Sequence, residues 1–108
     1  MNTEFRHIVI VVKEILGSCP VYKVGDRIFL EHGYILNPEK SSKVCLHSLA
    51  SVMPYYTALS RGIPPKDLGL CREGHKAYVQ CLDPCRYTGG GTVIFEISHI
   101  GGENRGKG

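Results

Sequence analysis

The sequence lacks a long hydrophobic run. Its longest uninterrupted apolar stretch, Ile8 to Val12, has five residues, whereas a membrane-spanning helix needs about 20. Lys13 and Glu14 end this stretch too early for a secretory signal, and no small-residue cleavage site follows. We therefore expect no transmembrane segment, no membrane partner and a cytoplasmic location.

A cluster of basic residues is also missing. The net charge is +3, and the Lys and Arg residues are scattered, apart from a hint of clustering in the last residues, 103–108. Proteins that bind nucleic acids usually carry a basic stripe or patch on one face. The sequence therefore argues against nucleic acid as a partner.

The composition shows no bias that would prevent a compact fold. A chain of 108 residues is long enough for one domain of ordinary size and too short for two. Its 43% hydrophobic and 21% charged residues are close to the globular average, which argues against disorder, collagen and coiled coil. We expect one α+β domain over residues 1–100 and a flexible, Gly-rich tail over 101–108.

Four segments have the character of β-strands. Residues 7–16 are rich in β-branched side chains without clean alternation, which is typical of a strand covered on both faces. Residues 27–30 form a short second strand, which 33–36 extend or pair with. The last two strands are predicted over 76–81 and 92–100, joined as a hairpin by a long loop.

One segment, residues 44–61, carries a helical pattern. Its apolar residues follow the spacing of one helix face: Leu46, Leu49, Ala50 and Met53. Pro54 interrupts the segment, so we expect a kink or two short helices, the second starting at Pro54. Gly62 and Pro64-Pro65 end it. The order β, β, α, β, β predicts a mostly antiparallel sheet of about four strands with the helices on one face.

The cysteines are the unusual feature of the composition. An odd count without a signal segment indicates reduced thiols rather than a disulfide framework. The five residues are Cys19, Cys45, Cys71, Cys81 and Cys85. Cys19, Cys45 and Cys81 each lie at the end of a predicted element, where turns present the sulfur and backbone N–H groups stabilise a thiolate. A cysteine that only packs has no reason to prefer such places.

These cysteines suggest a metal centre. Cys81 and Cys85 form a C-x3-C pair, a spacing common in zinc sites. Iron–sulfur clusters also take thiolates, and sulfur ligands disfavour Mg and Ca. The leading hypothesis is a zinc ion, another soft metal or an iron–sulfur cluster held by Cys19, Cys45 and Cys81, with Cys85 as a further ligand.

Four side chains are additional candidates for the site: His75, His99, Asp83 and Cys71. A histidine would complete a shell of three thiolates. Asp83 precedes Pro84, however, where Asp is ordinarily a turn residue. Free cysteines are often simply buried, and Cys71, in an irregular segment, fits an incidental thiol.

Two other classes of function stay open. A metal-free thiol enzyme would use Cys45 as its nucleophile, activated at a helix start, and would need a histidine within hydrogen-bond reach. His47, two residues later, would point to a different side of the helix. An interaction module would instead form homo-oligomers through an uncovered sheet face or edge. The sequence identifies no small molecule or redox partner.

The order of short motifs resembles a family of small bacterial and archaeal proteins with no established activity. Its members, roughly 90 residues long, carry "CP…GD", "C…LyPy" and "CPDP…FeI" motifs. The matching residues span 7–100 and are Cys19-Pro20, Gly25-Asp26, Cys45, Leu49, Pro54-Tyr55, Cys81, Asp83-Pro84 and Phe95-Glu96-Ile97. The resemblance implies that Cys19, Cys45 and Cys81 act together. Leu82 departs from the pattern by replacing a proline, and Cys71 and Cys85 are additions.

Overall fold

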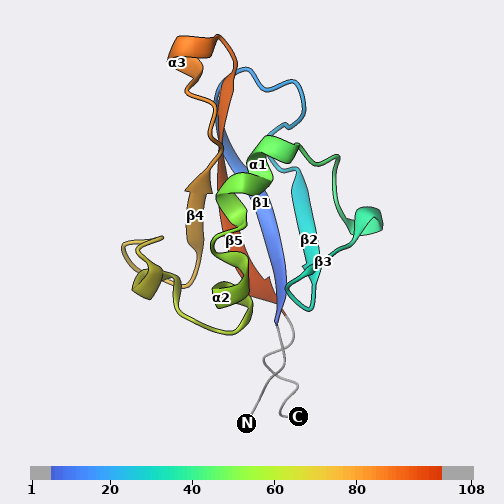
Figure 1. The fold of residues 1–108 in the computed structure, drawn as a ribbon, viewed down its shortest axis with the longest axis vertical. Helices are drawn as coiled ribbons and strands as arrows, with labels where there is room; N and C mark the ends of the chain where they lie inside the picture. The colour runs from blue at the N-terminus through green and yellow to red at the C-terminus, as the bar shows by residue number, and fades with distance from the viewer. Residues whose placement is uncertain (1–5, 101–108) are drawn as a thin grey trace.

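The computed structural model describes residues 6–100, and the tail predicted at 101–108 lies outside them. The described chain forms one sheet with the helices α1 (Leu46–Val52) and α2 (Tyr56–Ser60) against one of its faces (Figure 1). This confirms the α+β class. The strands are β1 (His7–Gly17), β2 (Arg27–Glu31), β3 (Ile35–Leu36), β4 (Ala77–Gln80) and β5 (Gly91–Ile100). The other helical segments are α3 (Cys85–Thr88) and the 3-10 turns η1 (Pro38–Lys40) and η2 (Pro65–Leu68).

The sheet is antiparallel throughout the described residues, in the order β3-β2-β1-β5-β4. The long strands β1 and β5 pair along their whole length, from His7 opposite Ile100 to Gly17 opposite Gly91. A bulge between Val12 and Glu14 shifts the register of this pair. β4 pairs with β5 as the predicted hairpin with a long loop, and β1 pairs with β2 on the side away from β5.

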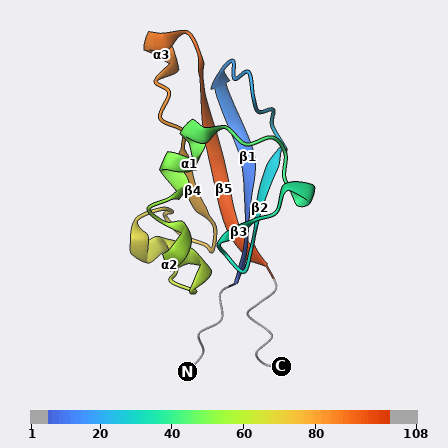
Figure 2. The same ribbon diagram turned by 45° about the vertical axis from the view of Figure 1, so that its right-hand side comes forward.

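The core lies between the sheet and the helix pair α1–α2, which covers one face of the sheet (Figure 2). Alternate side chains of a strand share a face, and those that face the helices on β1 and β5 are almost completely buried: Ile8, Ile10, Val12, Val93, Phe95 and Ile97. On the opposite face, called the outer face below, Val9 and Phe29 are also buried. The predicted cover of β1 on both faces therefore holds at Val9, whereas Val11 and Lys13 on the same outer face are partly or fully exposed.

The helix pair forms as predicted, but with different ends. The predicted second helix does not start at Pro54; α2 begins at Tyr56, after a turn in which the Tyr55 N–H donates to Val52 O at 3.0 Å. The predicted long loop before β5 contains α3, whose four residues are too few to show a period in the sequence. Among the described residues, no helix has the length and apolar character that crossing a membrane requires.

The predicted apolar face of α1 is wrong. Leu46 is 80% exposed and Met53 60% exposed, while Ser48 and Val52 are the buried residues of this helix. Ser48 occupies a core position because its hydroxyl meets a buried hydroxyl partner, Tyr22, at 2.8 Å. Hydrophobic periodicity does not detect a buried position such as this one, where a polar side chain is buried against a polar partner.

Gly33 allows the turn between β2 and β3 to touch two other elements. It has φ +83°, and a Cβ placed there would lie 2.2 Å from the Ser60 Cβ and 2.9 Å from the Arg6 carbonyl oxygen. The Arg6 N–H in turn donates to Ser60 O at 2.7 Å. A residue without a side chain is therefore needed where the β2–β3 turn, α2 and the start of β1 meet.

We expect Gly33→Ala to destabilise the fold by roughly 3 kcal/mol or more, because left-handed strain adds to overpacking. Gly74→Ala is the matched control, since Gly74 has φ +96° with nothing within 4 Å of an added Cβ. Gly74→Ala should lower the free energy of unfolding only by the cost of the left-handed backbone conformation, about 1–2 kcal/mol. Urea denaturation of both variants measures the difference, and equal losses would contradict the close packing at Gly33.

Candidate functional site

Three cysteines lie at one end of the sheet, which we call the thiol end. Cys19 follows β1, Cys45 is the residue before α1, and Cys81 follows β4. In Figure 1, β1 ends near the top of the sheet, and β4 ends and α1 begins lower down in the same upper half. Cys81 belongs to the core, and Cys19 and Cys45 pack against it. All five cysteines of the chain are free thiols.

The sulfur of Cys19 is surrounded by backbone donors. Its Sγ accepts N–H groups from Val21 at 3.4 Å and from Tyr22 at 3.3 Å. Pro20 restricts the backbone between the sulfur and these donors. Two N–H dipoles aimed at one sulfur form the kind of turn that stabilises negative charge. The residue is partly buried and packs against the core.

Tyr22 connects the Cys19 turn to Cys45. The Tyr22 hydroxyl accepts the Cys45 N–H at 2.8 Å and lies 2.8 Å from Ser48 Oγ. Ser48 Oγ donates to the Cys45 carbonyl at 2.7 Å, so the proton between the two hydroxyls comes from Tyr22. The three residues form a closed circuit of hydrogen bonds that begins and ends on the backbone of Cys45.

The electrostatic environment of Tyr22 also joins the two cysteines. Burial raises the pKa of the Tyr22 phenol above its ordinary value of 10.0, and the hydrogen bonds with Ser48 and the Cys45 N–H partly oppose this rise. Negative charge on Cys45 and on Cys19 raises this pKa further. Both sulfurs therefore lie within electrostatic reach of one buried hydroxyl.

Gly91 brings Cys19 and Cys81 to the same point on β5. A Cβ on Gly91 would lie 2.7 Å from the Ser18 carbonyl carbon and 2.9 Å from the Cys19 nitrogen. From the other neighbouring strand, the Cys81 thiol donates to Gly91 O at 3.5 Å and accepts the Val93 N–H at 3.3 Å. Because β5 lies between β1 and β4, the two cysteines flank its first residues.

Cys85 and Asp83 lie beside the thiol end, in the segment that carries α3. The Cβ of Cys85 would be 3.3 Å from a Cβ on Gly17, and its N–H donates to Thr92 Oγ1 at 3.4 Å. The Asp83 carboxylate accepts the Thr88 hydroxyl, and its carbonyl accepts the Thr92 hydroxyl. Asp83 thus holds the α3 segment on β5, in keeping with a turn residue.

The other candidates lie elsewhere. His99 pairs with Ile8 at the start of β1, and the 11 residues of β1, at about 3.3 Å each, place it roughly 30 Å from the thiol end. His75 precedes β4, and Cys71 lies between η2 and β4 with its Sγ 3.9 Å from Gly74 O. The structure does not bring these three side chains to Cys19, Cys45 and Cys81.

No preformed metal site is found in the part of the chain that the structure describes. Across residues 6–100, no group of three or more His, Cys, Asp or Glu side chains is arranged to hold a metal ion. The three cysteines of the thiol end share neighbours, but their sulfurs do not surround an ion-sized space in this arrangement.

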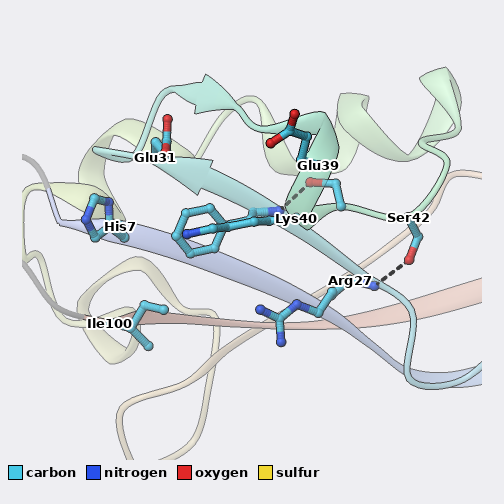
Figure 3. Close-up of a pocket in the computed structure, with 9 residues that line it drawn as sticks. His7, Arg27, Glu31, Glu39, Lys40, Ser42 and Ile100 are labelled. Carbon is cyan, nitrogen blue, oxygen red and sulfur yellow. Dashed lines mark hydrogen bonds between the residues drawn. The ribbon is translucent and has the colours of Figure 1, made fainter.

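A wide groove of about 680 Å³ lies on the outer face of the sheet (Figure 3). The Lys40 ammonium lies 4.9 Å from the centre of the Phe29 ring, and the His7 ring contacts the same phenylalanine at 5.6 Å between centroids. Glu31 and Arg27 also line the groove, so its charge is mixed. Its lining comes from alternate residues of β2, from residues 39–42 and from His7 and Ile100, a set that forms no recognisable sequence motif.

Comparison with protein-family models, with curated proteins and with solved structures finds no match. The likeness of the cysteine motifs to the small bacterial and archaeal family therefore stays a prediction. Function has to be inferred from the geometry of this chain.

We expect Tyr22→Phe to lower the free energy of unfolding by about 1–3 kcal/mol, because it leaves the Cys45 N–H without its acceptor. Tyr78→Phe is the matched control, since that hydroxyl donates to Glu96 at 2.9 Å on the exposed surface. Tyr78→Phe should change the free energy of unfolding by no more than about 0.5 kcal/mol. Urea denaturation compares the two, and a Tyr22→Phe variant as stable as the control would rule out the circuit.

The raised pKa of Tyr22 also predicts a loss of stability in alkali. The unfolded phenol loses its proton near its ordinary value of 10.0, whereas the folded phenol keeps it to higher pH. This stabilisation is complete below that pH and is lost as pH rises through the folded pKa. The free energy of unfolding should fall less steeply with rising pH in Tyr22→Phe than in wild type. Tyr87→Phe, whose side chain is 84% exposed, should show the same fall as wild type.

Proposed function

We propose that this is a thiolate protein in which Cys19, Cys45 and Cys81 bind a soft metal ion or an iron–sulfur cluster. The observation that carries the proposal is the pair of backbone N–H groups of Val21 and Tyr22 that Cys19 Sγ accepts. Hydrogen bonds to the sulfurs of a metal centre disperse their charge and tune the centre. A sulfur that only packs needs no such donors.

Two further features support the same assignment. Cys81 also accepts a backbone N–H, from Val93, and Cys45 is fixed by the Tyr22 circuit rather than by a frayed helix end. Three thiolates form a soft donor set, which favours zinc, copper(I) or iron–sulfur centres. Cys85, which lies beside Gly17, is the candidate for a fourth ligand, because a tetrahedral centre has one position beyond three thiolates.

The proposal requires the sulfurs to turn toward one another on binding, because the described side chains do not surround an ion. Rotation of a cysteine between staggered χ1 wells moves the sulfur without moving the backbone. The close approach of the backbone at Gly91, Cys19 and Val93 means that the strands and turns already stand together. Binding then orders side chains rather than the fold.

Metal-free thiol chemistry is the second candidate, and the same N–H donors favour it at Cys19. This differs from the expectation that Cys45 is the nucleophile. The helix that follows Cys45 has seven residues, and the backbone N–H of Cys45 is already used by Tyr22. Cys19 and Cys45 are both partly buried, and it is the sulfur of Cys19 that accepts two backbone N–H groups.

We expect protein purified without oxygen or chelators to carry zinc, copper or iron in a fixed ratio to the chain. Cys19→Ser, Cys45→Ser and Cys81→Ser should each lose most of that metal, since a hydroxyl is a poor substitute for a thiolate. Cys71→Ser is the matched control and should retain it, because Cys71 lies away from the thiol end. Elemental analysis and a visible absorption spectrum make the measurement.

The same preparation separates the alternatives. Metal-free wild type in which iodoacetamide modifies Cys19 much faster than the other cysteines would replace the metal proposal with thiol chemistry. Metal retained equally in all four variants would show that the ligands lie elsewhere. If all three Ser variants fold, bind no metal and self-associate like wild type, an interaction module would be the better description.

A further inference from the structure

The end of the sheet opposite the thiol end gathers three basic side chains. Arg6 lies just before β1, His99 near the end of β5, and His75 just before β4. His99 is two positions from the buried Ile97 on β5 and so shares its face, while Arg6 and His75 precede β1 and β4. The three therefore lie at the same end of the sheet.

These side chains line one pocket of about 130 Å³. Its walls are apolar and come from Ile8, Leu59, Ile97 and the segment 62–65 that follows α2. None of the described residues that line it is acidic. The pocket thus combines positive or ionisable groups at one side with hydrocarbon around them, a combination that orients a ligand with one charged end.

Arg6 is held in place, but most of its hydrogen-bonding capacity is unused. Its N–H donates to Ser60 O at 2.7 Å, and its guanidinium rests against Gly62, 3.1 Å from the position a Cβ would take there. Within residues 6–100, the guanidinium makes one hydrogen bond, to His99 Nε2 at 3.4 Å, and no ion pair. A guanidinium has five N–H donors.

The contact with His99 makes an anion favourable at this point. A guanidinium only donates, so Nε2 of His99 accepts and the neutral ring carries its proton on Nδ1. The two groups are close enough that a second positive charge, on His99, would face the first directly. An anion between Arg6 and the histidines would accept the remaining donors and remove that conflict.

We propose that this pocket binds the carboxylate of a small organic acid, with the Arg6 guanidinium on the carboxylate and the segment 62–65 around its hydrocarbon part. The planar fork of arginine matches a carboxylate in bidentate geometry. The volume, 130 Å³, equals about four water molecules. It admits a short-chain acid and is too small for a nucleotide. This site is independent of the cysteines.

A titration of the full-length, ¹⁵N-labelled protein with sodium propionate at constant ionic strength tests the proposal. Saturable shifts are expected at the amides of Gly62, Ile63 and His99. Arg6→Gln should raise the Kd at least tenfold, and Arg6→Lys should raise it several-fold because the fork is lost. Arg27→Gln, which removes an arginine from the groove on the outer face, should leave the Kd unchanged.

Two further measurements keep the test decisive. Ile63, which is 42% exposed, can be changed to Ser without opening the core, and Ile63→Ser should weaken propionate several-fold but not inorganic phosphate. Phosphate binding as tightly as propionate to wild type would overturn the assignment to organic acids. The absence of saturable shifts, or the same Kd in Arg6→Gln and wild type, would overturn the site itself.

Discussion

The hydroxyl of Tyr22 is the constraint on which the thiol end depends. It is the only partner that the structure shows for the Cys45 N–H within residues 6–100, and it also takes Ser48 into the core. The ring packs edge-on against Phe95 at 5.6 Å between centroids, so the circuit is anchored on β5. A buried polar network of this kind is stabilising only when every member is satisfied. Here each donor has an acceptor, and the start of α1 is fixed relative to the Cys19 turn.

The second constraint is the absence of side chains where strands meet. Gly17 and Gly91 face each other at the end of the β1–β5 pair, and a Cβ on Gly17 would lie 2.4 Å from Gly90 O. The backbone leaving β1 therefore runs directly against the backbone entering β5. This contact, rather than any contact between cysteines, brings Cys19 and Cys81 together. Antiparallel topology makes it possible, since the end of one strand adjoins the beginning of its neighbour.

Much of the fold was predictable because it follows from local patterns. The β-branched run after His7, the alternation around Phe95 and the proline at position 54 each determine an element through its own neighbours in the chain. The buried face of α1 was not predictable, because Ser48 is buried through a partner 26 residues away. The separation of His75 and His99 from the cysteines was equally hidden, since it depends on the register of β4 and β5. The sequence shows which residues lie at the ends of helices and strands. At which end of the sheet each of them lies depends on the order and direction of the strands.

That topology also keeps two chemically opposed ends apart. The cysteines lie at one end of the sheet, and the Arg6–His99 pocket, whose described lining has basic but no acidic side chains, lies at the other. The length of β1 separates them by roughly 30 Å, several times the screening length of about 8 Å at physiological ionic strength. Charge at one end therefore contributes almost nothing to the affinity at the other. The β1–β5 pair lies between the two ends, and four of its β1 side chains, Ile8, Val9, Ile10 and Val12, are buried. The longest strand pair of this domain therefore sets the distance between the cysteines at one end and the Arg6–His99 pocket at the other.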